Sequence, residues 1–180
     1  MNVYVMRHGT TVWNEAGRTQ GRTNNRLSRA GIELTKKVAE EHANVKFDAI
    51  ICSPLMRTVQ TANLMNEYHN VKIIKDQRLI EIDQGIFAGR VYKTLTEEEK
   101  KIKNSRDASC GMESYQSVYT RILDFIIELN REKKYDNVLI VTHNTPASFI
   151  ANIYNNVEVD FSCYEHLHNF KNAQVKCFKV

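Results

Sequence analysis

The sequence has 180 residues, of which 42% are hydrophobic and 26% are charged, and its formal net charge is +4. This length predicts one domain with a sizeable core, and no linker, repeat or low-complexity tract divides the chain. The lysines and arginines are dispersed, which argues against nucleic acid as a partner, and the first residues lack the apolar stretch of a signal peptide or membrane span. We expect a soluble, cytoplasmic protein that contacts neither nucleic acid nor membranes; its oligomeric state stays open. Four cysteines without metal-ligand spacing are expected to be free thiols: Cys52, Cys110, Cys163 and Cys177.

Short apolar runs alternate with helical patterns along the first half of the chain. Residues 3–6 are apolar and predict a buried strand that ends at the tripeptide Arg7-His8-Gly9. Ser28 is expected to cap a helix that continues to about Glu41. Apolar residues repeat at helical spacing in this helix, at Ala30, Leu34, Val38 and Ala39. A second strand is predicted at 47–52, followed by Ser53 as a helix cap and Pro54 as the first helical residue.

The second half of the chain continues the alternation. After a helix to about residue 68, the pattern predicts a strand at 71–74, a long helix at 114–134, a strand at 138–141, a helix at 147–154 and a last strand at 175–180. Strands that alternate with helices predict an α/β fold, a three-layer α/β/α sandwich around a mostly parallel central sheet. Ligands of such sheets bind beyond the carboxyl ends of the strands. The residues of interest are therefore those that follow strands: Arg7, His8, Ser53, Arg57 and His143.

Two histidines and two arginines at one sheet edge are suited to phosphoryl transfer. Neutral imidazole is a competent nucleophile, and guanidinium groups bind phosphate oxygens in pairs while keeping their charge. Gly9 would let the backbone approach an anion without a Cβ in the way, and Asn14 would add a neutral donor. Taken alone, each residue has an ordinary explanation, because a single histidine at a strand end is more often structural than catalytic.

Six motifs follow one another in order along the chain. They are R-H-G-T at 7–10 with Asn14, Gly17-Arg18 and Gln20-Gly21 downstream, L-S-R-A-G at 27–31, S-P-L-M-R-T-V-Q-T-A at 53–62, L-I-E with a later glycine at 79–85, E-S with a later valine and arginine at 113–121, and V-T-H at 141–143. Together they resemble the histidine phosphatase superfamily, which has a phosphoglycerate-mutase-like fold. The resemblance covers most of the chain, with a looser echo at 172–175.

The resemblance implies a role for each motif residue and no metal or cofactor. His8 would attack phosphorus and carry a phosphohistidine. Glu81 would give a proton to the leaving oxygen and later take one from the attacking water, with Asp83 as the second candidate for this role. The implied catalytic set is His8, Glu81, His143, Arg7 and Arg57. The implied phosphate-binding set is Arg7, Asn14, Gln20, Gly21, Arg57, His143 and Asn144. His166 and His168 have no acidic or cysteine partner at a zinc spacing, so we interpret them as a polar strand edge.

Three positions depart from the family pattern. Asn144 takes the place of a glycine, Ser148 that of an arginine, and Phe87-Ala88-Gly89 that of a Trp-Glu-Gly. We expect Asn144 to tolerate unusual backbone angles and all these changes to touch the rim of the pocket, where they alter the choice of substrate. Phe87, Tyr92, Tyr115 and Tyr119 either line an entrance or only pack.

The motifs do not separate a phosphatase from a mutase. Only a short segment, Arg90 to Gly111, stands between the glutamate motif and the next one, and an open site favours water as acceptor. We therefore predict a phosphatase, with a single domain over 1–180 in which residues 86–112 form a small lid or specificity insertion. A phosphoglycerate-mutase-type phosphotransferase and a binding domain without turnover are the alternatives. The partner would be a small phosphorylated metabolite, whose identity the sequence leaves open.

Overall fold

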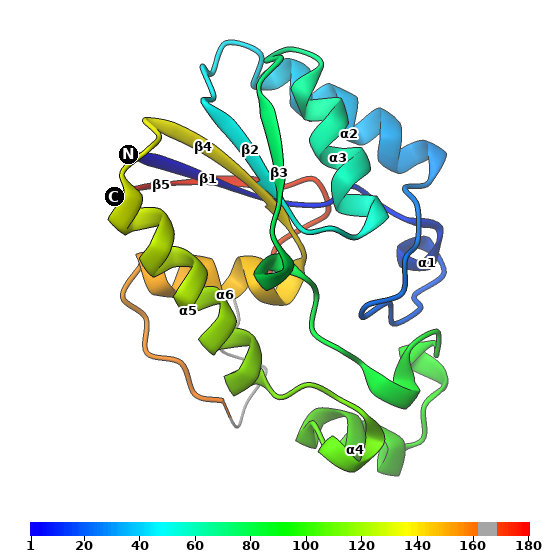
Figure 1. The fold of residues 1–180 in the computed structure, drawn as a ribbon. Helices are drawn as coiled ribbons and strands as arrows, with labels where there is room; N and C mark the ends of the chain where they lie inside the picture. The colour runs from blue at the N-terminus through cyan, green and yellow to red at the C-terminus, as the bar shows by residue number, and fades with distance from the viewer. Residues whose placement is uncertain (162–168) are drawn as a thin grey trace.

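A computed structural model describes residues 1–161 and 169–180, and Figure 1 gives the order of its elements. Cys163, His166 and His168 lie outside the described residues. The expected free thiol at Cys163 and the expected polar strand edge at His166 and His168 therefore stay predictions. The strands are β1 (Asn2–Arg7), β2 (Ala49–Cys52), β3 (Lys72–Lys75), β4 (Asn137–Thr142) and β5 (Val175–Lys179). The helices are α1 (Val12–Glu15), α2 (Arg29–Glu41), α3 (Met56–Asn66), α4 (Glu97–Ser105), α5 (Tyr115–Glu132) and α6 (Asn144–Tyr154).

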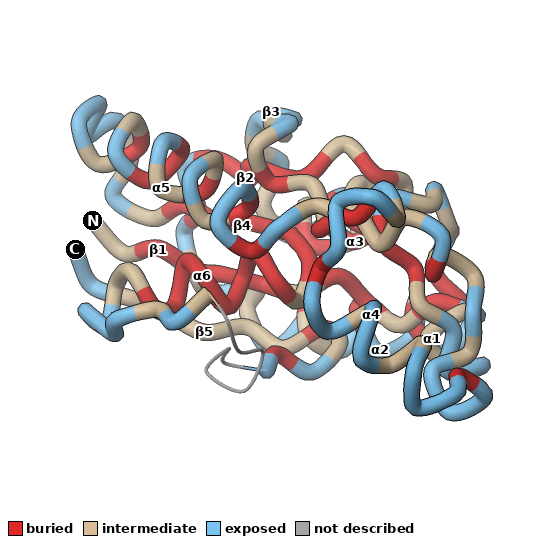
Figure 2. Tube along the Cα trace, turned by 90° about the horizontal axis from the view of Figure 1, so that it is seen from below, coloured by how far each residue is buried: buried red, intermediate tan, exposed pale blue. Residues whose placement is uncertain are grey.

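The strands form a five-stranded sheet in the order β3-β2-β4-β1-β5. All neighbouring pairs are parallel except β1 with β5, so the predicted mostly parallel α/β sheet is confirmed. The central strands are buried on both faces, because helices cover the sheet from both sides (Figure 2). Continuous apolar runs such as β2 and the inner part of β4 are typical of strands in this position.

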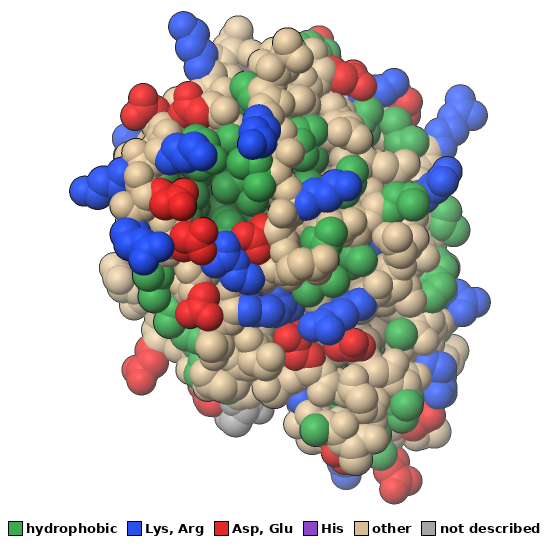
Figure 3. Space-filling view, in the orientation of Figure 1, with side chains coloured by type: hydrophobic (Ala, Val, Ile, Leu, Met, Phe, Trp, Pro, Cys, Tyr) green, Lys and Arg blue, Asp and Glu red, His purple; other side chains and the backbone are tan. Residues whose placement is uncertain are grey.

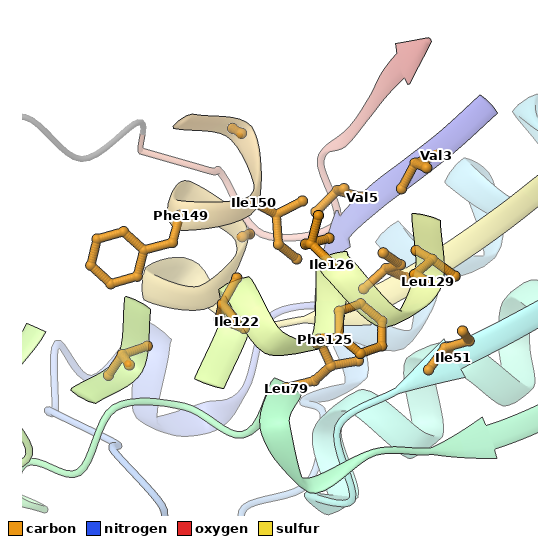
Figure 4. Packing of buried hydrophobic residues seen from close by; sticks show 14 of the residues in the cluster. Val3, Val5, Ile51, Leu79, Ile122, Phe125, Ile126, Leu129, Phe149 and Ile150 are labelled. Carbon is orange, nitrogen blue, oxygen red and sulfur yellow. The ribbon is translucent and has the colours of Figure 1, made fainter. Parts of the chain in front are cut away.

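Alternate residues of each strand pack into two separate cores. Val3 and Val5 of β1 face α5 and α6, whereas Met6 faces the side of α2 and α3. Figure 4 shows the first core, where side chains of α5 gather with those of β1 and α6. The inward residues predicted for the long helix are all buried: Val118, Ile122, Phe125 and Leu129. The three layers are therefore the sheet and the helices packed against each of its two faces.

Two helix starts differ from the prediction. Helix α3 begins at Met56 with Leu55 as its N-cap, so Ser53 and Pro54 precede the helix instead of starting it. The Ser53 hydroxyl lies 2.8 Å from Nε2 of His143, and this contact takes the place of a capping bond. Helix α6 begins at Asn144, three residues before the predicted start, directly after the strand that carries the histidine.

The buried face of α2 also differs from its apolar pattern. Leu34 is 40% exposed, whereas Gly31, Thr35 and Ala39 are buried against the rest of the protein. A Cβ on Gly31 would lie 1.9 Å from the carbonyl oxygen of Thr10, so this face lies on backbone and has no room for large side chains. Ser28 is the N-cap, as predicted, and its side chain accepts from the amide of Gly31.

The segment between β3 and α5 forms short 3-10 turns and helix α4, which lies apart from the sheet (Figure 1). The side chain of Thr96 accepts from the amide of Glu99, and the Glu99 carboxylate accepts from the amide of Thr96. This capping box explains why an acidic run begins a helix here. Arg106 ends the helix in the left-handed region and donates to the backbone oxygens of Asp83 and Glu113, which ties α4 to the segment after β3.

Candidate active site

The register of the sheet brings the residues after three strands to one edge. Arg7 of β1 lies opposite Thr142 of β4, so His8 and His143 follow side by side. Their ring centroids are 5.3 Å apart, and both rings are almost completely buried. Cys52 of β2 lies opposite Val141, which places Ser53 next to the same pair. The carboxyl edge of the sheet therefore holds the histidines that sequence analysis singled out.

His8 is held in one tautomer, with the lone pair on Nε2. Its Nδ1 lies 2.7 Å from the carbonyl oxygen of Gly9, which only accepts, so Nδ1 carries the proton and donates it. Nε2 in turn accepts from Nε of Arg57 at 3.2 Å. Burial, with smaller contributions from Arg57 and Arg7, holds the pKa of His8 well below its ordinary value of 6.5. The ring is therefore neutral at physiological pH, with its unprotonated nitrogen, Nε2, against Arg57.

Arg57 is fully buried, and the protein fixes each of its three nitrogens. Nη1 donates to the carbonyl oxygen of Thr23 at 2.7 Å, Nη2 to that of Gly21 at 2.8 Å, and Nε to His8. Burial lowers the pKa of Arg57 to about 10, so the side chain stays charged at neutral pH. The guanidinium therefore sets a positive charge against the nucleophile without freedom to move.

Arg7 and His143 also lie close to His8. Arg7 donates from Nη1 to the carbonyl oxygen of Phe170 at 2.5 Å. Burial lowers the pKa of His143 well below its ordinary value, with Arg57, His8 and Arg7 acting in the same direction. Nδ1 of His143 is buried and has no hydrogen-bond partner among residues 1–161 and 169–180. A second neutral imidazole with one unused nitrogen therefore lies beside His8.

Two amide side chains line the cavity, and their oxygens accept hydrogen bonds from the protein. Oδ1 of Asn14 accepts from the backbone amide of Thr11 at 3.1 Å and from Nδ2 of Asn172 at 3.3 Å. Oε1 of Gln20 accepts from the hydroxyl of Thr11 at 2.9 Å. Both residues line the cavity, so each presents an NH₂ group suited to an anion. Sequence analysis did not assign Thr11 or Asn172; the only signal for Asn172 was the loose motif echo at 172–175.

Glu81 is the carboxylate of the cavity wall. Its Oε1 accepts from the backbone amide of Ile82 at 2.9 Å, and the side chain lines the cavity. Asp83, the second candidate, is not in the wall; its Oδ1 accepts from the amide of Gly85 and its Oδ2 faces Arg22 at 3.7 Å. The structure therefore separates the two candidates by location, with Glu81 on the side of the histidines.

The cavity has a volume of about 320 Å³ and is lined mostly by polar and charged groups. Of the predicted residues, those that line it are Arg7, His8, Asn14, Gln20, Gly21, Arg57, Glu81 and Asn144. His143 does not line it, although its ring lies against that of His8. It also takes in residues that were not assigned to the site: Arg18, Thr19, Gln84, Tyr92, Lys103, Asn104, Tyr115 and Thr145. Of the four aromatic residues left open, Tyr92 and Tyr115 reach the cavity, whereas Phe87 and Tyr119 pack in hydrophobic clusters.

Three structural expectations for this region are wrong. A Cβ on Gly9 would meet the hydroxyl of Thr35 at 2.3 Å, so this glycine makes room for α2 and not for an anion. Asn144 is the first residue of α6 and needs no unusual backbone angle; its Oδ1 accepts from the amide of Phe170 at 3.0 Å. Ser148 is fully buried and donates to the carbonyl oxygen of Asn144, so it is not a rim residue.

In residues 1–161 and 169–180, no three His, Cys, Asp or Glu side chains lie together in a way that would hold a metal ion. In the same part of the chain, no helix is both long and apolar enough to cross a membrane.

Relatives with known names share the sequence pattern of this chain. Phosphoserine phosphatase 1 of Hydrogenobacter thermophilus is 32% identical over 157 residues, which cover 81% of this chain and 72% of that protein. The probable phosphoglycerate mutase GpmB of Proteus mirabilis is 36% identical over 105 residues, 58% of this chain and 49% of that protein. The chain thus matches about half the length of this mutase relative.

Solved structures share the fold. A mycobacterial glucosyl-3-phosphoglycerate phosphatase, solved as a complex with VO3, superposes with a TM-score of 0.85 at 22% identity, covering 98% of this chain and 91% of that one. The α-ribazole phosphatase of Shigella flexneri superposes with a TM-score of 0.80 at 23% identity, covering 96% of each chain. The fold is therefore phosphoglycerate-mutase-like, as the motifs implied.

The family itself is identified by a match over nearly the whole chain. Residues 3–179 fit the sequence pattern of the histidine phosphatase superfamily, branch 1, and contain each strand that delivers a residue to the cavity. With the paired histidines, the fixed arginine and the superposed phosphatases, this match shows that the chain belongs to the histidine phosphatase superfamily (branch 1).

Proposed function

We propose that the protein is a metal-independent phosphomonoester hydrolase that transfers a phosphoryl group to Nε2 of His8 and from there to water. The observation that carries the proposal is the state of His8: a buried, neutral ring whose proton is fixed on Nδ1 and whose Nε2 lone pair lies against the Arg57 guanidinium. A neutral imidazole held in one tautomer attacks phosphorus without first losing a proton. The phosphatase relatives in the same family support this reading.

In the first step, Nε2 of His8 forms a bond to phosphorus while the bond from phosphorus to the ester oxygen breaks. Glu81, in its protonated form, gives a proton to the departing alcohol. In the second step, water attacks the phosphohistidine, the N–P bond breaks, and Glu81 takes the proton of the water. Inorganic phosphate leaves and His8 is again neutral.

The transferred group gathers negative charge on its equatorial oxygens, and the fixed donors stabilise this charge. In this proposal, Arg7, Arg57 and His143 would hold the oxygens of the group on His8. The NH₂ groups of Asn14 and Gln20, the backbone at Gly21 and Asn144 at the start of α6 would complete the set. Because these donors are held by the protein before the substrate arrives, they need no reorganisation during the reaction. Removal of one such donor typically slows turnover on the order of 10²–10³-fold.

The test is phosphate release from an aryl phosphate, sugar phosphates and 3-phosphoglycerate, with EDTA present. We expect release by the wild type and none by His8→Ala, which thermal unfolding must show to be folded. A labelled substrate should also leave acid-labile phosphate on the wild-type protein and none on the variant. Release that persists in His8→Ala, or that EDTA abolishes, would overturn the mechanism.

The mutase relatives suggest phosphoglycerate mutase activity as a second candidate function. A mutase returns the phosphoryl group to its substrate, so it needs a priming bisphosphate and excludes water. We prefer the hydrolase, because the segment at 86–112 is short and helix α4 covers the cavity only at its rim, through Lys103 and Asn104. Conversion of 3-phosphoglycerate to its isomer without phosphate release would favour the mutase. Ligand binding without labelling of His8 would favour a binding domain.

We propose that residues 86–112 act as the lid of this cavity within a single domain. Three residues of this segment, Tyr92, Lys103 and Asn104, line the cavity together with His8. Its ends are held by the isolated bridge between Arg18 and Val91 and by Arg106, which donates to Gln84 at 3.0 Å. The substrate is thus a small phosphorylated metabolite whose non-phosphate part contacts this segment.

A further inference from the structure

Ser53 is one of the residues that follow a strand of the sheet, and the proposed mechanism gives it no role. It comes directly after β2, whereas His143 comes directly after the neighbouring strand, β4. Both side chains are fully buried, and Oγ of Ser53 lies 2.8 Å from Nε2 of His143. The direction of this hydrogen bond decides which ring nitrogen of His143 carries the proton.

The partners of Ser53 favour its hydroxyl as the donor in this bond. Oγ of Ser53 already accepts from the backbone amide of Leu55 at 3.4 Å, and within residues 1–161 and 169–180 Nε2 of His143 is the only acceptor for the hydroxyl proton. If Nε2 donated instead, the serine proton and Nδ1 of His143 would both be buried without a partner. With Ser53 as donor, only Nδ1 stays unused. A buried polar group without a partner costs free energy, so donation by Ser53 is favoured.

The single proton of His143 then lies on Nδ1. Burial, with Arg57 as the next cause, holds the pKa of His143 well below its ordinary value, so the ring is neutral. Since Nε2 accepts from Ser53, the proton of the neutral ring is on the other nitrogen, which has no partner in the described part of the chain. The ring centroid of His8 lies 5.3 Å away. A buried N–H donor without an acceptor is therefore held beside the proposed nucleophile.

A second cavity of the protein, about 150 Å³ between α5 and β3, differs in this respect. Figure 3 shows its hydrophobic floor with charges of both signs around it. Its arginine, Arg78, contacts both Asp76 and Glu128 at 2.6 Å. None of the described residues that line this cavity has a buried polar atom without a partner. The unused donor of His143 thus distinguishes the candidate active site, where a ligand can supply the acceptor.

We propose that Ser53 is a positioning residue that fixes the proton of His143 on Nδ1, so that this ring donates a hydrogen bond to an oxygen of the phosphoryl group on His8. A lone pair at Nδ1 would repel the negative oxygens of that group, whereas an N–H stabilises them. The effect on turnover rests on the proposed phosphatase function, but the position of the proton does not. Ser53 touches no reacting atom and acts only through His143.

The first experiment determines the tautomer of His143 in the protein without ligand at neutral pH. In a long-range ¹H–¹⁵N correlation spectrum of protein with ¹⁵N-labelled histidine, ring nitrogens with and without a proton are well separated, and only six histidines contribute. The spectrum of His143→Asn assigns the signals of His143. We expect the wild type to carry the proton on Nδ1 and Ser53→Ala to lose this preference. The control Thr58→Val removes a buried hydroxyl that donates to the carbonyl oxygens of Ser53 and Leu55, and it should keep the proton on Nδ1.

The second experiment tests whether this tautomer matters for turnover. Phosphate release from an aryl phosphate is measured for the wild type, Ser53→Ala, His143→Asn and the double variant, each shown to be folded by thermal unfolding. We expect Ser53→Ala to lower kcat on the order of 10- to 100-fold, less than full loss of a donor, because His143 still samples the Nδ1–H form. In the His143→Asn background, Ser53→Ala should lower kcat by about twofold at most, because residues that act as one unit are not additive.

A proton on Nε2 of His143 in the wild type would overturn the inference, and this spectrum needs no variant of Ser53. A proton that stays on Nδ1 in Ser53→Ala, or an unchanged kcat in that variant, would also overturn it. An equal loss of kcat from Ser53→Ala in both backgrounds would show a merely structural role and overturn it as well. Release that does not depend on His8 would overturn the phosphatase and leave the measured tautomer as it is.

Discussion

Two substitutions of Arg57 distinguish the effect of its positive charge from the effect of its fixed hydrogen bonds. Arg57→Met removes the positive charge and all three donors, whereas Arg57→Lys keeps the charge and loses the planar fork. In the methionine variant, the carbonyl oxygens of Gly21 and Thr23 lose the donors now at 2.8 and 2.7 Å. A buried acceptor left without a donor costs about 1–3 kcal/mol, so we expect the free energy of unfolding to fall by about 2–5 kcal/mol.

The same two variants should raise the pKa of His8 by different amounts. Arg57 is one of the charges that hold the pKa of His8 low, after burial. Its removal raises this pKa, so the acidic limb of the kcat/KM profile moves to higher pH in Arg57→Met and moves less in Arg57→Lys. Loss of a donor at the phosphoryl group should also lower kcat on the order of 10²–10³-fold in both.

The assay is phosphate release from an aryl phosphate between pH 4 and 9, with urea unfolding of each variant at one temperature. Urea unfolding shows that the variants are folded under the conditions of the rate measurement. A folded Arg57→Met protein that keeps the wild-type kcat and the wild-type acidic limb would refute the reasoning about this residue.

Three further predictions follow from the site. Glu81→Gln should slow alkyl phosphates at least tenfold more than aryl phosphates, because only the alkyl leaving group needs the proton; equal losses would count against Glu81. Burial and neighbouring arginines hold the pKa values of His8 and His143 well below 6.5. Below pH 6.5 the unfolded chain therefore binds more protons than the folded protein. For each of the two rings, the free energy of unfolding should fall by up to about 1.4 kcal/mol for every pH unit of acidification. Urea unfolding of the wild type and His143→Asn should show this slope reduced in the variant; equal slopes would contradict it. Nδ2 of Asn172 donates to the carbonyl oxygen of His8 and to Oδ1 of Asn14, so we expect Asn172 to position both residues. Asn172→Asp places a carboxylate against these oxygens and should lower kcat about 10- to 100-fold; an unchanged kcat would exclude this role.

The sequence by itself determined the order of elements and the position of His8, the proposed nucleophile. Apolar runs such as 138–141 are local signals, and a strand that ends in a histidine places that histidine at the carboxyl edge of a parallel sheet. Ordered motifs then identified the family, and the match over residues 3–179 confirms it. Helix ends were less predictable: Ser53, a good capping residue, contacts His143 instead, because the two strands lie next to each other in the sheet.

Only the tertiary structure decided how the site is held and which residues line its cavity. Nε2 of His8 accepts from Arg57, which is 49 positions away, and Arg7 donates to a backbone oxygen 163 positions away. Such contacts carry no local sequence signal, because a carbonyl oxygen is present at every position. Lys103 and Lys100 are likewise indistinguishable as letters in an acidic and basic run. In the structure, Lys103 lines the cavity, whereas Lys100 forms an ion pair with Glu97.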